Sequence, residues 1–140
     1  MKWIRWFLAG ALAVPLAHHL ALAAFYAAGL APYRPYSLAP TKPFGVPQVF
    51  SLMFWGGVWG IILGLVLLRV HNARTWWIVA ILVGAIAPTL VAGLVVAPLK
   101  GQHMKPTPSL AMMGFAVNGA WALGTAVFYR LMERWTGAYH

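Results

Sequence analysis

The sequence predicts an all-α fold: an integral membrane bundle of four transmembrane helices that form two similar helical hairpins. The first observation is composition, because 62% of the 140 residues are hydrophobic and only 8% are charged, which is beyond the usage of ordinary globular domains. The second is that the apolar residues fall into four runs of about 20 residues, the length that a helix needs to cross a bilayer core of about 30 Å. The third is that the two halves of the chain share an order of glycines, prolines and tryptophans.

The four runs place the transmembrane spans at about residues 6–30, 48–68, 76–97 and 110–131, so that residues 1–140 make a single transmembrane domain. The first run follows a basic N-terminus, as a signal peptide does, but two histidines interrupt it and we expect a retained span. Residues 31–47 contain five prolines, which forbid a regular helix. We therefore expect an ordered loop at the membrane surface there.

The basic residues lie singly near the ends of the runs, and the chain has 10 of them against one acidic residue. That distribution is typical of snorkelling side chains and of the positive-inside rule, so nucleic-acid binding is not expected. The side with more basic residues has six: Lys2, Arg5, Arg69, Arg74, Arg130 and Arg134. The other side has four: Arg34, Lys42, Lys100 and Lys105. This difference predicts that both termini are cytoplasmic in a multi-pass protein of the bacterial inner membrane.

Small residues recur every four positions in the second span, at Gly56, Gly60 and Gly64. Hydrophobicity alone does not hold helices together in lipid, whereas small residues let two backbones approach closely. We therefore predict a helix-packing seam at these glycines, with Trp55 and Trp59 filling the space beside it. The corresponding small residues of the fourth span are Gly119, Ala122 and Ala126.

The internal repeat aligns the first span with the third and the second span with the fourth. Gly10-Ala-Leu-Ala is followed by Pro15, as Gly84-Ala-Ile-Ala is followed by Pro88. Lys42-Pro43 precedes the second span, and Lys105-Pro106 precedes the fourth. The Gly-x-Trp triplets at 57–59 and 119–121 complete the match. These matches predict two hairpins of the same orientation, related by an axis along the membrane normal.

His18 and His19 lie near the middle of the first span, and ionisable residues at that depth are candidates for function. Neighbouring side chains on an α-helix point about 100° apart, so the pair is not expected to bind one metal from one face. One reading is axial ligation of a haem or a chlorophyll-type magnesium, or a polar contact to a quinone. The other is a neutral imidazole that bonds to a backbone carbonyl or to Asn118. A haem held by two histidines of this chain is not expected, because His71, His103 and His140 lie outside the spans.

Asn118 falls near the middle of the fourth span. An amide there either donates a hydrogen bond to a neighbouring helix or contacts a substrate or cofactor, so we include it with the two histidines as a candidate binding residue. Thr89 follows Pro88, and we expect its hydroxyl to bond back to its own helix.

Several chemistries are excluded by residues that the spans lack. The chain has no cysteine, which excludes disulfides, thiolate metal sites and thiol catalysis. Its one acidic residue, Glu133, lies beyond the fourth span. Carboxylate acid–base pairs, carboxylate metal sites and a Ser-His-Asp triad are therefore unavailable. Small four-helix multidrug exporters carry a carboxylate inside a transmembrane helix, and this chain lacks one. We predict that the chain is not an enzyme.

The segment Ala39–Gln48 and the Gly-x-Trp helices resemble uncharacterised small bacterial four-helix inner-membrane proteins with paired hairpins. The resemblance covers most of the chain and implies no particular activity. Our first hypothesis is a non-catalytic membrane subunit that packs against partner helices, lipids or cofactors in a larger complex, with electron transfer or photosynthesis as the setting. The alternatives are a tetrapyrrole- or quinone-binding protein that uses His18 or His19, and a small homo-oligomeric transporter or channel.

Overall fold

The computed structural model describes residues 1–102, 105 and 107–137. Among these residues the fold is all-helical apart from one short β-hairpin. Three residues that entered the sequence argument, His103, Pro106 and His140, lie outside the described residues. The elements in chain order are α1 (Lys2–Ala13), the π-helical turn η1 (Val14–His18), α2 (His19–Ala27), β1 (Pro40–Thr41), β2 (Val46–Pro47), α3 (Gln48–Leu67), α4 (Ala73–Val91), the π-helical turn η2 (Ala92–Val96), α5 (Ala97–Leu99) and α6 (Pro108–Trp135).

Within the described part of the chain, four helices are long and apolar enough to cross a membrane: Lys2–Ala27, Gln48–Leu67, Ala73–Leu99 and Pro108–Trp135. This confirms the predicted number of apolar helices, although three of the predicted ranges were too short or displaced. The first helix begins at Lys2 instead of residue 6, and the fourth continues to Trp135 instead of 131. Capping explains the earlier start of α4. The side chain of Asn72 accepts from the backbone N–H of Thr75 at 3.0 Å, which starts α4 within a polar turn.

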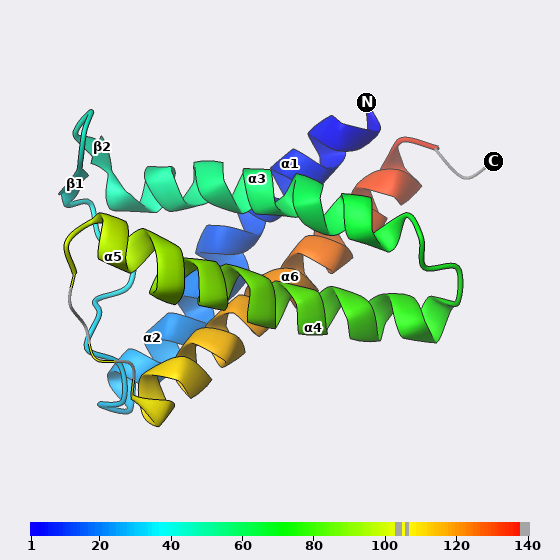
Figure 1. Ribbon diagram of the computed structural model, residues 1–140. Helices are drawn as coiled ribbons and strands as arrows, with labels where there is room; N and C mark the ends of the chain where they lie inside the picture. The colour runs from blue at the N-terminus through cyan, green and yellow to red at the C-terminus, as the bar shows by residue number, and fades with distance from the viewer. Residues whose placement is uncertain (103–104, 106, 138–140) are drawn as a thin grey trace.

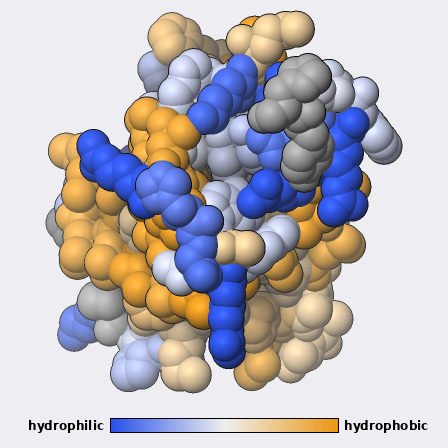
Figure 2. All heavy atoms as spheres, turned by 90° about the vertical axis from the view of Figure 1, so that its right-hand side faces the viewer, coloured by the Kyte–Doolittle hydropathy of each residue, from blue (hydrophilic) through white to orange (hydrophobic). Residues whose placement is uncertain are grey.

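The helices form two crossing pairs (Figure 1). The chain of α1, η1 and α2 lies beside α6, and α3 and α4 cross in front of them. Contacts between α1 and α3 and between α4 and α6 are extensive, whereas α3 and α4 meet only sparsely. We call the end with the N-terminus, the α3–α4 turn and the end of α6 the terminal end, and the end with β1 and β2 the loop end. Figure 2 views the terminal end, where hydrophilic side chains gather between hydrophobic flanks.

The crossing of α1 and α3 is a backbone-to-backbone contact made by glycines from both helices. A Cβ atom added to Gly10 would overlap the carbonyl oxygen of Gly56, and one added to Gly60 would overlap the carbonyl oxygen of Trp6. One turn further along, Gly64 lies against the indole of Trp6. The small residues therefore face α1, while Trp55 does not fill space beside them, because its side chain is 56% exposed.

The small residues of α6 make a similar but looser contact with α4. A Cβ atom added to Gly84 would overlap the Cβ of Ala122, whereas one added to Gly119 would meet the Cβ of Ala85 at an ordinary 3.6 Å. Ala126 is fully buried in the core. Backbone approach is thus closest where α1 meets α3.

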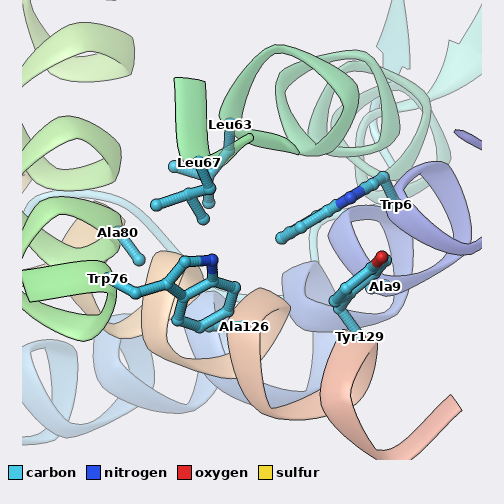
Figure 3. Close-up of a cluster of buried hydrophobic side chains, with 8 residues drawn as sticks. All are labelled: Trp6, Ala9, Leu63, Leu67, Trp76, Ala80, Ala126 and Tyr129. Atoms are coloured by element: carbon cyan, nitrogen blue, oxygen red, sulfur yellow. The ribbon is translucent and has the colours of Figure 1, made fainter. Parts of the chain in front are cut away.

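The largest core cluster lies toward the terminal end and draws side chains from all four long helices (Figure 3). The rings of Trp6 and Tyr129 stack with centroids 3.7 Å apart and planes 11° apart, which joins α1 to α6. The guanidinium carbon of Arg130 lies 4.4 Å from the ring centroid of Trp76, a cation–π contact between α6 and α4. Arg130 also pairs with Glu133 at 3.5 Å. Aromatic packing therefore joins the helices at this end, around a small open cavity of about 190 Å³ that Trp6, Trp76 and Tyr129 help to line.

Candidate functional site

The π-helical turn η1 sets the positions of the two histidines in the first span. The Nδ1 atoms of His18 and His19 lie 3.2 Å apart, so one donates a hydrogen bond and the other accepts it. The two imidazoles are thus joined through their Nδ1 atoms, although they face different surroundings: His18 lines a groove described below and His19 does not. The sequence argument assumed regular α-helical geometry, whereas η1 widens the helix immediately before His19. The pair requires at least one neutral imidazole, because two protonated rings have no acceptor nitrogen.

Tyr36 closes over this turn from the connection between α2 and β1. Its hydroxyl donates a hydrogen bond to the carbonyl oxygen of Pro15 at 2.7 Å. Its ring centroid lies 4.9 Å from that of His19, and His19 is only 2% exposed. The ordered loop predicted for residues 31–47 thus folds back onto the first span. The sequence suggested only that Tyr36 lies at the membrane surface, and its contact with the histidine turn was not predicted; the signal for that contact was the proline inside an apolar run.

Asn118 bonds across helices. Its Nδ2 donates to the hydroxyl oxygen of Thr89 on α4 at 2.8 Å. The hydroxyl of Thr89 donates in turn to the carbonyl oxygen of Ala85 at 2.7 Å, which confirms the expected bond within its own helix. A two-step chain of hydrogen bonds therefore joins α6 to the backbone of α4, just beside Pro88.

A groove lies between α3 and the α4–η2–α5 stretch toward the loop end, and its cavity volume is about 970 Å³. Its walls come from α3 and from the last turns of the α4 span, and its floor comes from the helices behind them (Figure 1). The floor carries His18, Asn118 and Trp121. Apolar side chains dominate the α3 wall, namely Phe50, Leu52, Phe54, Trp55, Val58, Trp59 and Ile62.

The structure brings together two of the three candidate binding residues. His18 and Asn118 line the groove, whereas His19 is not among its described lining residues. Within the described part of the chain, His, Cys, Asp and Glu side chains form no group of three that could hold a metal ion. The floor therefore offers one imidazole and one amide as hydrogen-bonding groups inside an apolar slot.

Two lysines complete the groove at the loop end. Lys42 lies in the turn between β1 and β2, and Lys100 directly follows α5. Gln48 and Ser51, in the first turn of α3, line the same end. The groove thus has a polar, basic mouth and an apolar interior.

Comparison with protein-family models, with curated proteins and with solved structures gives no match to this chain.

Proposed function

We propose that this chain is a multi-pass protein of the bacterial inner membrane, with both termini in the cytoplasm, that holds an amphipathic molecule of the bilayer in its groove without chemically changing it. Four helices of sufficient length and apolarity support membrane insertion. The excess of basic residues at the terminal end supports the orientation.

The single observation that carries the binding proposal is the groove itself. Its volume of about 970 Å³ lies at the upper end of the range for ligand sites in proteins. It combines apolar walls with a few convergent polar groups, the usual composition of such sites. Polar side chains are costly at membrane depth, and a ligand with hydrogen-bonding groups would stabilise His18 and Asn118, which line the groove.

We further propose that the chain consists of two similar hairpins, one formed by α1–α2 with α3 and the other by α4 with α6. We propose that it is a subunit of a larger membrane complex. The α4 span is the least buried of the four candidate spans, and every residue from Val91 to Val96 is exposed. Such a surface suits lipid or the helices of partner subunits, or of further copies of this chain. An electron-transfer or photosynthetic complex remains our proposed setting.

A tetrapyrrole or quinone is the second candidate ligand, and the position of His18 on the groove floor favours it. His19 is the weaker candidate of the pair because Tyr36 covers it. Visible absorption of the native protein that shifts in His18→Ala would support a tetrapyrrole, and a colourless native preparation would count against it. The third candidate, a homo-oligomeric transporter or channel, is tested by solute flux in liposomes that contain this chain alone.

The experiment that tests the binding proposal fills the groove. Ala92 on η2 lines it, so Ala92→Trp places an indole in the ligand's space. Ala116 on α6 is exposed and is not among the described lining residues, so Ala116→Trp is the matched control. Particles extracted in mild detergent are analysed for mass, co-migrating chains, lipid and pigment. We expect Ala92→Trp alone to lose a stoichiometric small molecule, and equal retention by both variants would contradict binding in the groove.

A further inference from the structure

We propose that the groove holds an anionic phospholipid, with the phosphate between Lys42 and Lys100 and an acyl chain along α3. This inference rests on the proposed function, because it names the class of amphipathic molecule that the groove binds. It goes beyond that function by assigning the two lysines to a headgroup site.

The two lysines come from different parts of the chain, and both line the groove at the loop end. Lys42 precedes α3 and Lys100 ends the α4 span, yet both line the cavity. The side chain of Gln48 and the hydroxyl of Ser51 line the same end. Two cationic groups with neutral hydrogen-bonding groups beside them match a phosphate and its ester oxygens.

This chain has no acidic side chain to neutralise these lysines. Its only acidic residue, Glu133, lies near the end of α6 and pairs there with Arg130 at 3.5 Å. Both lysines are exposed, and a phosphate held at this end of the groove would replace solvent as their charge partner. A neutral quinone offers no such partner, whereas a phospholipid headgroup does.

The apolar part of the groove has the length of one leaflet. Phe50, Phe54, Val58 and Ile62 line it at intervals of about one helical turn. Between the first and the last of these residues α3 rises about 18 Å, at about 1.5 Å per residue. Half of a hydrocarbon core of about 30 Å is about 15 Å. An acyl chain that starts at the loop end can therefore lie against α3 down to the middle of the bilayer.

The test measures the affinities of phosphatidylglycerol and phosphatidylcholine with the same acyl chains, by native mass spectrometry of the full chain in mild detergent. The test variant is Lys42→Gln with Lys100→Gln. The matched control is Arg34→Gln with Lys105→Gln, which removes the same charge from the same side at exposed residues outside the described lining. Lys42→Arg with Lys100→Arg keeps the charge and serves as the rescue variant.

We expect wild type, the control and the rescue variant to prefer phosphatidylglycerol. The test variant should bind it about thirtyfold more weakly, if each lysine contributes as a basic residue does at an anionic membrane surface, with phosphatidylcholine affinity unchanged. Equal affinities for both lipids in wild type, a preference that survives in the test variant, or a neutral quinone that displaces phosphatidylglycerol from the groove would overturn the inference.

The same titration separates failure of this inference from failure of the proposed function. If Ala92→Trp weakens binding of both lipids while wild type does not distinguish them, the groove binds amphipathic molecules without selecting charge, and only the headgroup assignment is wrong. If Ala92→Trp binds both lipids as tightly as Ala116→Trp does, the proposed function and this inference fail together.

Discussion

A single methyl group at Gly60 should strongly destabilise this bundle. Gly60 lies where α3 crosses α1, and a Cβ there would overlap the carbonyl oxygen of Trp6 and lie 3.1 Å from the Cα of Gly10. Both contacts are with backbone, which cannot turn away as a side chain can. Gly60→Ala therefore forces the two helices apart.

The expected loss of stability follows from the kind of atoms that the added methyl group meets. Overpacking a well-packed site costs about 1–3 kcal/mol, and the lower values belong to sites where a side chain yields. Because separation at Gly60 also opens the neighbouring contact between Gly10 and Gly56, we expect the upper end of that range. Gly60→Ala should lower the free energy of unfolding by about 3 kcal/mol.

The matched control is Gly119→Ala, the same substitution in α6, where the added Cβ would meet the Cβ of Ala85 at 3.6 Å. It should leave stability unchanged or raise it by up to about 1 kcal/mol, because alanine favours a helix interior over glycine and no new clash is created. Both variants are compared with wild type by reversible unfolding in mixed detergent micelles, followed by tryptophan fluorescence and circular dichroism. The reasoning is refuted if Gly60→Ala unfolds with the wild-type free energy, or if Gly119→Ala is destabilised equally.

Three further predictions concern hydrogen bonds between segments. A double-mutant cycle of Asn118→Ala with Thr89→Val should give a coupling energy of about 0.6 kcal/mol, and no more than about 1.7; zero coupling would mean that the 2.8 Å bond does not stabilise the bundle. Trp121→Phe should cost about 1–2 kcal/mol, because it leaves the buried carbonyl of Gly10 without its 2.9 Å donor; an unchanged unfolding midpoint would contradict this. Tyr36→Phe should speed hydrogen exchange and proteolysis in the segment between α2 and β1, and protection equal to wild type would show that the hydroxyl does not fasten it.

The existence of the helices could be predicted from sequence, because length and apolarity are properties of each segment alone. The helix ends could not be fixed in this way, since caps such as Asn72 extend a helix into polar sequence. The positions of the small residues pointed to close contacts, but not to their partners. No periodicity in α3 indicates that Gly60 meets the carbonyl of Trp6.

The sequence identified two residues on the floor of the candidate site, but it did not predict the cavity around them. His18 and Asn118 stood out because polar side chains are rare inside apolar runs. The groove lies between α3, which packs on α1, and the α4 span, which packs on α6. Its position depends on the contacts of both helices at once, so the sequence alone did not connect Lys42 with Lys100.

Pro15 explains why two distant segments are fastened to the middle of the first span. Without an N–H it cannot bond to the carbonyl of Ala11, and the N–H of Val14 bonds there instead. The carbonyl of Gly10 then accepts from the indole of Trp121 on α6.

Beyond the proline, η1 shifts the backbone bonds from i–4 to i–5, so that the N–H of His19 bonds to the carbonyl of Val14. The carbonyl of Pro15 accepts from Tyr36. One missing N–H thus produces two acceptors inside an apolar helix that is long enough to cross a membrane, where an unpaired carbonyl would cost several kcal/mol. The two donors that satisfy them hold α6 beneath the groove and fold the loop over the histidines, so the proline that disrupts the helix also organises the site.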